Sequence, residues 1–249
     1  MPMEPGLEDL IDQPSSEIRF IEEGFNFNIH CKEIAYHESG HFLFDCLVEK
    51  ESLGFTKILE AQIHVDEIEI SGNVKTAEDP KRKSELRIRE FYLENLNRIA
   101  FRILALCAGY ASYLTFIKKD EYYIGIYNMV LTRYKLEYFP TDDLGFDYMK
   151  VKKYLAYHGI TEKEKILRII VFTNKELIDF MSKPQNKCAM GYLKNTFLKN
   201  NKLLLQGNKI RRMKKMVYNH TKNIYLTDLL CKVGNEIKRL KENLALTTD

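Results

Sequence analysis

Two histidines four residues apart constrain this chain more than any other feature. Residues 35–43 read AYHESGHFL, so His37 and His41 project from the same face if the segment is helical. That spacing lets two imidazole nitrogens reach one Zn²⁺. Glu38 lies on the adjoining edge, where its carboxylate can reach a metal-bound water. The pattern H-E-x-x-H therefore predicts two zinc ligands and a general base from one helical turn.

The sequence around the motif favours a helix. Asn26 to Asn28 can cap a helix that runs to about Lys50, and apolar residues recur inside it at helical spacings. The alternative is an ordinary core helix with two histidines on one side. Burying two histidines and a glutamate without a metal requires a polar partner for each of them, so we favour a metal site.

A catalytic zinc needs a third protein ligand and an open fourth position. No further histidine follows His41 within a few residues, so the metzincin extension is absent. The remaining candidates are His64, His158, His220 and acids presented by another helix. Residue spacing leaves these alternatives open.

A family resemblance narrows the choice. AYHESGH resembles the AYHEAGH motif of the FtsH-type AAA+ proteases, the M41 peptidase family, whose third ligand is an Asp in a later N-D-L segment. That segment opens a helix that ends in Y-G-M. Here Asp142-Asp143-Leu144 opens a helix that ends at 157–161, YHGIT, with the family's spacing. The resemblance implies that Asp143 is the third zinc ligand and that Asp142 replaces the family's Asn. Helix capping is the alternative role of both aspartates.

The resemblance covers residues 28–160, with specific motifs only at the two metal-binding helices. LALCAGYASY (104–113) stands where the family has L-G-G-R-A-A-E-E, and only Gly109 and Ala111 are retained. Residues 63–74 take the place of the family's edge strand beside the metal cleft, to which an extended substrate can add through main-chain hydrogen bonds. No G-x-x-x-x-G-K-[ST] run is present. A separate ATPase partner and a homo-oligomer are therefore open possibilities.

Periodicity predicts an α+β fold that is predominantly α-helical, and the resemblance to the M41 family implies that it is zincin-like. Residues 62–65 and 67–70 alternate polar and apolar side chains, which predicts a small β-sheet near residues 56–76 with a turn at 71–73. Helices are expected over 80–117, from Pro140 to about His158, over 162–181 and through the C-terminal third. We predict an acidic N-terminal arm (1–25) and one peptidase-like domain (26–249). Its metal-binding core is 26–160 and its helical, basic part is 161–249.

Charge is distributed unevenly along the chain. The 249 residues carry a net charge of +3, but 187–241 holds fourteen Lys/Arg against two acids. Such a region could attract nucleic acid. No Gly-Phe or zinc-knuckle pattern of a nucleic-acid module accompanies it, so we interpret it as a solvated helical surface and do not expect a nucleic-acid partner.

The remaining features favour a soluble, cytoplasmic protein with no membrane partner. The most apolar segment, 99–117, contains Arg102 and is typical of a buried core helix. The N-terminus lacks the basic start and apolar middle of a signal peptide. The five cysteines are scattered, which argues against disulfides and against a cysteine zinc site.

The leading hypothesis is a zinc-dependent endopeptidase that binds one catalytic Zn²⁺ and cuts flexible or unfolded polypeptides, with Glu38 as the base. Two alternatives remain open. One is a non-catalytic, peptidase-like binding protein, and the other is a nucleic-acid-associated protein that uses the basic C-terminal region.

Overall fold

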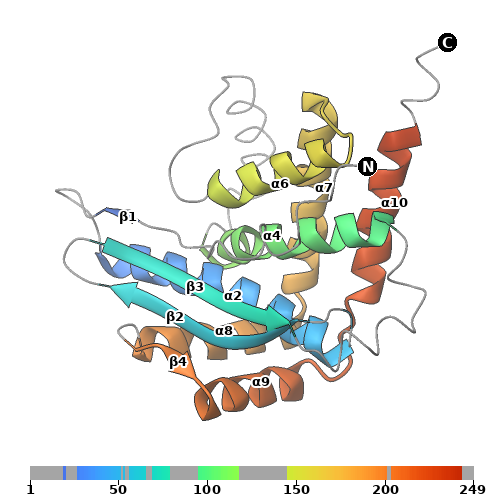
Figure 1. Ribbon diagram of the computed structural model, residues 1–249. Helices are drawn as coiled ribbons and strands as arrows, with labels where there is room; N and C mark the ends of the chain where they lie inside the picture. Colours follow the sequence, from blue (N-terminus) through green and yellow to red (C-terminus); the bar gives the residue numbers. More distant parts are fainter. Residues whose placement is uncertain are drawn as a thin grey trace.

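The helix that carries the H-E-x-x-H motif is the centre of the structure. In the computed structural model, this helix, α2 (Phe27–Glu51), lies behind a small sheet and is covered by helices on its other sides (Figure 1). Most of its side chains from position 31 onward are buried, including Phe42, Phe44 and Leu47. The structure describes residues 19–20, 27–51, 53, 56–65, 69–78, 95–117, 145–200 and 203–242.

The described chain is mostly helical with a small antiparallel sheet, which confirms the predicted α+β, mainly α-helical class. In chain order the elements are β1 (Arg19–Phe20), α2, β2 (Thr56–Val65), β3 (Glu69–Glu78), α4 (Asn95–Ile117), α6 (Gly145–Tyr157), α7 (Lys163–Met181), α8 (Pro184–Lys199), β4 (Leu205–Gln206), α9 (Asn208–His220) and α10 (Thr227–Glu242). The strand order in the sheet is β1-β3-β2-β4.

One predicted turn is wrong. Ser71, Gly72 and Asn73 lie inside β3, where they pair with His64, Ile63 and Gln62 of β2. A Ser-Gly-Asn sequence favours a turn locally, but a glycine inside a strand often marks a close approach of another group. Here that group is Glu38 of α2, whose Cγ would lie 2.5 Å from a Cβ atom added at Gly72. The packing of the strand on α2 therefore decides the conformation.

Helices α2 and α4 cross at very short range and run antiparallel. A Cβ atom added at Gly40 of α2 would collide with the carbonyl oxygen of Ala108 and lie 2.6 Å from Cβ of Ser112. The Ser112 hydroxyl donates a hydrogen bond of 2.6 Å to the carbonyl oxygen of Tyr36. Small residues on both helices thus allow their backbones to meet beside the motif.

The last three residues of α2 attach the C-terminal helices to it. Glu49 accepts hydrogen bonds from Nζ of Lys214 on α9, at 2.6 and 2.9 Å, and from the backbone N–H of Ile58 at 2.5 Å. Lys50 donates to three carbonyl oxygens that follow α9, those of residues 221, 222 and 224. Glu51 accepts from the backbone N–H of Leu226, just before α10. We call these three residues the α2 clamp.

Helix α4 is long and apolar enough over Arg98–Phe116 to cross a membrane, but 78% of that window is buried inside the protein. It packs against α2, α7, α10 and α6, as expected of a core helix. Helix α6 ends as predicted, near His158, where Gly159 takes a left-handed φ of 80° and the N–H of Ile160 returns to the carbonyl oxygen of Leu155. Its predicted opening at 141–144 lies outside the described residues, as do 79–94 and most of the predicted N-terminal arm.

Candidate metal centre

His37 and His41 bring their Nε2 atoms together on the face of α2 that meets α4. The two nitrogens are 3.0 Å apart, and the rings are inclined at 72° with centroids 4.7 Å apart. Both side chains are buried. Two nitrogens bound to one tetrahedral Zn²⁺ would lie about 3.3 Å apart. The observed separation differs from that value by only a few tenths of an ångström, so the pair fits zinc with a small adjustment of the rings.

The carbonyl oxygen of Ala105 on α4 fixes the orientation of one ring. Nδ1 of His41 lies 3.0 Å from this oxygen, and because a carbonyl oxygen can only accept, Nδ1 carries the proton. Nε2 of His41 then has the lone pair that a metal requires. A backbone carbonyl behind a histidine is a common way to set the tautomer of a ligand.

Gly109 provides the space for both rings. A Cβ atom added at this position would lie 2.5 Å from Cε1 and Nε2 of His37 and would collide with Nε2 of His41. Any other residue at this position of α4 would have to displace one imidazole or the helix. Gly109 is also one of the two residues of 104–113 that match the family motif, so its retention has a physical reason in this packing.

The two histidines contact α4, whereas the side chain of Glu38 is directed towards the sheet. It is 0% exposed, and a Cβ atom added at Gly72 of β3 would lie 2.9 Å from its Oε1. The carboxylate therefore lies between α2 and β3, one residue along the chain from His37. Its position in the sequence is that of the general base in H-E-x-x-H.

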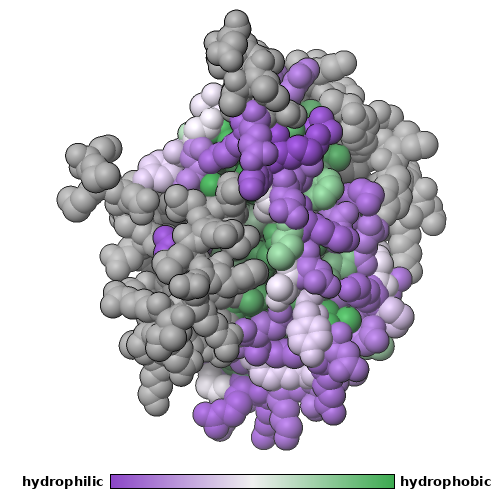
Figure 2. Space-filling view, turned by 90° about the vertical axis from the view of Figure 1, so that its right-hand side faces the viewer, coloured by the Kyte–Doolittle hydropathy of each residue, from purple (hydrophilic) through white to green (hydrophobic). Residues whose placement is uncertain are grey.

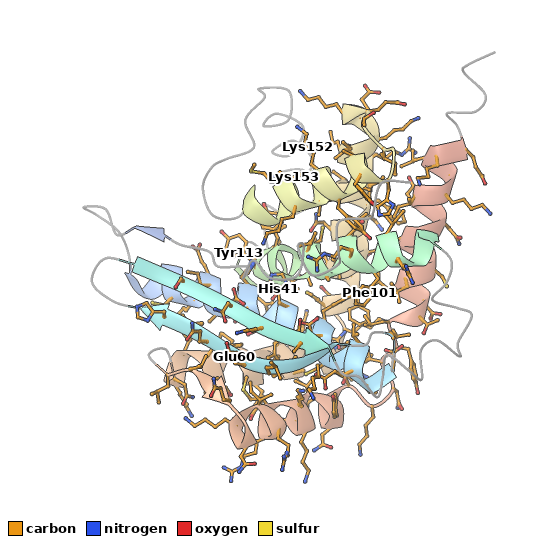
Figure 3. All side chains as sticks on the ribbon, viewed as in Figure 1. His41, Glu60, Phe101, Tyr113, Lys152 and Lys153 are labelled. Carbon is orange, nitrogen blue, oxygen red and sulfur yellow. The ribbon has the colours of Figure 1, made fainter. Side chains whose placement is uncertain are left out.

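Polar side chains flank the pair along the same stripe of α2. One turn before His37, Glu33 accepts a hydrogen bond of 3.2 Å from the hydroxyl of Tyr113 on α4. Figure 3 shows Tyr113 and His41 between the two helices. One turn after His41, burial raises the pKa of Asp45 to about 7, and the attraction of His41 opposes that rise. The stripe from Glu33 to Asp45 is thus polar over about three turns, although the helix around it is a core helix.

The described residues do not contain a third ligand. Among them, no group of three or more His, Cys, Asp or Glu side chains could hold a metal ion. His64 is exposed on β2, and the ring of His158 lies against those of Tyr154 and Tyr157 at the end of α6. His220 ends α9. None of the three histidine alternatives to Asp143 joins His37 and His41.

Asp143 lies outside the described residues, two positions before α6 begins. The first turn of α6 nevertheless contacts α4 next to Gly109. Tyr148 of α6 packs edge to face on Tyr110 of α4, with ring centroids 5.1 Å apart, and Tyr110 follows Gly109 in the chain. The start of α6 therefore approaches α4 at the level of the glycine that contacts both histidines.

Sequence reasoning missed three groups that shape this centre: the Ala105 carbonyl, Gly40 and Gly72. The small residues of 104–113, which permit another helix to approach closely, are the sequence signal for the first contact. A glycine inside an alternating strand pattern was the signal for the third, and it was interpreted as a turn. Gly40 lies inside the motif itself, where its role is visible only once α4 is in place.

Comparison with known proteins adds no relative. No protein-family model matches the chain, and no match is found among curated proteins or solved structures.

Proposed function

We propose that this chain is a zinc-dependent endopeptidase of the zincin type, similar to the FtsH peptidase. It would act on flexible or unfolded polypeptides in the cytoplasm. The observation that carries the proposal is the 3.0 Å approach of the two Nε2 atoms, with one ring oriented by a backbone carbonyl. Asp143 is the proposed third ligand, on the basis of the family resemblance and its position just before α6.

In the proposed reaction, His37 and His41 would hold one Zn²⁺ through Nε2. A zinc ion held there would supply a water molecule of lowered pKa and would polarise the scissile carbonyl group. Glu38 takes a proton from the attacking water and passes it to the leaving amine, which is the role of a general base that then becomes a general acid. The burial of Glu38 between α2 and β3 supports this role because it holds the carboxylate in one place.

The decisive test of catalysis is Glu38→Gln, assayed with fluorescein-labelled casein as an unstructured substrate. We expect the variant to retain one zinc per chain by metal analysis and to lose at least about 100-fold in cleavage rate, the usual contribution of a general base. Equal cleavage by the variant and the wild type would refute the catalytic role of Glu38.

The ligand set needs a separate test. Asp143→Ala and His41→Ala should each lose zinc, whereas Asp142→Ala should retain it and lose only helix capping. Asp142→Ala is the matched control, since it removes a neighbouring carboxylate from the same segment. Full retention of tightly bound zinc by Asp143→Ala would exclude Asp143 as the third ligand.

One observation favours a second candidate, a peptidase-like protein that binds polypeptides without cutting them. Glu38 is 0% exposed, whereas a base in a working site must reach a water and a substrate. This candidate predicts that wild type and Glu38→Gln bind labelled casein equally and that neither cleaves it with zinc bound. Cleavage by the wild type alone would exclude it.

A further inference from the structure

The longest stretch of the chain without an acidic residue forms one side of the structure. Between Asp179 and Asp228 the sequence has eleven Lys or Arg and no Asp or Glu. This stretch forms α8, β4 and α9. In Figure 1, α9 lies along the lower edge of the molecule, beneath the sheet, and Figure 2 shows hydrophilic side chains gathered at the lower end of the adjoining face.

Four basic side chains of α9 point outward. Lys209, Arg211, Arg212 and Lys215 are all exposed, and we call them the cationic face of α9. The helix buries its opposite side through Ile210, Met213 and Val217. Since Lys209 and Lys215 are six residues apart, the face spans about 9 Å along the helix axis.

Several exposed cations of α7 and α10 are paired with acids. Arg239 binds Glu236 at 2.6 Å, Lys232 binds Glu176 at 2.8 Å, and Lys175 contacts Asp179 at 3.3 Å. The cationic face differs. Over the described ranges, no ion pair joins any of its four side chains to a carboxylate, and the fifth basic residue of α9, Lys214, turns inward to Glu49. An ordinary solvated surface would carry mixed charges, as α7 and α10 do.

The cationic face is also held in place. Lys214 donates to both carboxylate oxygens of the buried Glu49 and to the carbonyl oxygen of Ile58 at 3.1 Å. Nζ of Lys50 binds the carbonyl oxygens that follow the helix. Because α9 is attached to α2 at its middle and just after its C-terminal end, the helix backbone that carries the four outward charges is held in place. A fixed row of charges loses little entropy when it binds a regular array of anions.

We propose that the cationic face of α9 binds the phosphate backbone of a nucleic acid. The alternative polyanion, an acidic membrane surface, is disfavoured because an interfacial helix inserts large apolar residues. Here the apolar residues of α9 are buried in the core, and Met216 is its only exposed large apolar residue. Two adjacent arginines suit phosphate, which they bind bidentately. Binding through the backbone carries no base specificity.

The test uses the full chain and a fluorescein-labelled 20-base-pair DNA duplex, measured by fluorescence anisotropy. Four phosphate contacts predict a slope of log K against log salt of about −3.6, which is a loss of about 150-fold between 50 and 200 mM salt. The test variant carries Lys209→Gln, Arg211→Gln, Arg212→Gln and Lys215→Gln. We expect its affinity at 50 mM salt to fall at least about 50-fold.

A matched control distinguishes the effect of the cationic face from the effect of the protein's net charge. Lys152→Gln, Lys153→Gln, Lys232→Gln and Lys238→Gln remove the same four charges from exposed positions on α6 and α10. Figure 3 shows Lys152 and Lys153 at the far side of the molecule from α9. The control should lose less than about threefold in affinity. Circular dichroism and thermal unfolding of both variants verify that each is folded.

Three results would overturn the proposal. The first is equal loss of DNA binding in the two quadruple variants. The second is a salt slope near zero. The third is co-sedimentation of the wild type with phosphatidylserine vesicles at a salt concentration where it does not bind the duplex, since this would assign the face to a membrane. This proposal is independent of the zinc site, because no residue of the cationic face contacts it.

Discussion

Replacing Gly109 by alanine tests the packing around the imidazole pair. Alanine favours a helix interior by about 1 kcal/mol over glycine, so propensity alone predicts that Gly109→Ala stabilises α4. The structure predicts the opposite. The new Cβ would lie 2.5 Å from Cε1 and Nε2 of His37, whereas ordinary carbon contacts begin near 3.5 Å. The rings or the helix must therefore move by about 1 Å.

The sign of the stability change in Gly109→Ala depends on which of two opposing contributions is larger. Overpacking a well-filled site costs about 1–3 kcal/mol, which exceeds or cancels the helix-propensity gain and leaves a net loss of about 0–2 kcal/mol. Gly191 on α8 provides the matched control, since no atom lies within 4 Å of a Cβ added there. Gly191→Ala should therefore stabilise the protein by up to about 1 kcal/mol. The two variants should differ by about 1–3 kcal/mol in the free energy of unfolding.

Urea denaturation in the presence of EDTA measures this difference without a contribution from metal. Titration calorimetry with Zn²⁺ then measures the effect on the candidate site. A shift of about 1 Å in the rings should weaken zinc binding by Gly109→Ala at least about 10-fold. The zinc affinity of Gly191→Ala should equal that of the wild type. If Gly109→Ala proved as stable as Gly191→Ala and bound zinc with wild-type affinity, the described packing of α4 on the histidines would be wrong.

Two further predictions concern groups around α2. Glu49→Ala leaves Lys214 with its ammonium in a mostly buried site and removes the acceptor of the Ile58 N–H, so it should cost about 3–5 kcal/mol in urea denaturation. Glu60→Ala removes a 3.5 Å contact with Lys75 and an exposed hydrogen bond from Gln206, so it should cost only about 1 kcal/mol. Equal costs in the two variants would contradict the role of the clamp. Burial raises the pKa of Asp45 to about 7, so the folded state binds its proton more tightly than the unfolded state, and wild-type stability should fall as the pH rises from about 4 to about 7. Since Asp45 is partly exposed, we expect the free energy of unfolding to fall by about 1–2 kcal/mol over that range. The Asp45→Asn variant should not show this fall. The same pH slope in the variant would assign the effect to another group.

Local sequence signals predicted the elements but not how they meet. The helix of α2, the end of α6 at Gly159 and the two strands near residues 56–76 follow from capping, glycine and alternation, which are properties of neighbouring residues. The turn predicted at Ser71–Asn73 failed because the conformation of Gly72 depends on Glu38, which is 34 positions earlier in the chain. A contact over that distance leaves no periodic trace in either segment.

In the candidate site, too, local sequence signals predict some features and long-range contacts determine the others. The spacing of His37 and His41 predicted their common face, because helical geometry alone determines it. The orientation of His41 by Ala105 depends on how α4 crosses α2, which the small residues of both helices permit but do not specify. Asp143 stays a prediction, because it lies outside the described residues.

The α2 clamp has a consequence for how the chain can be divided. The predicted metal-binding core, 26–160, contains Glu49, Lys50 and Glu51, but their partners lie at 214–227. A fragment that ends at 160 would keep both histidines and lose the acceptors and donors at the other end of their helix. The last third of the chain thus stabilises the end of the motif helix, and fusions or proteolytic fragments intended to isolate the candidate metal centre should extend through α10.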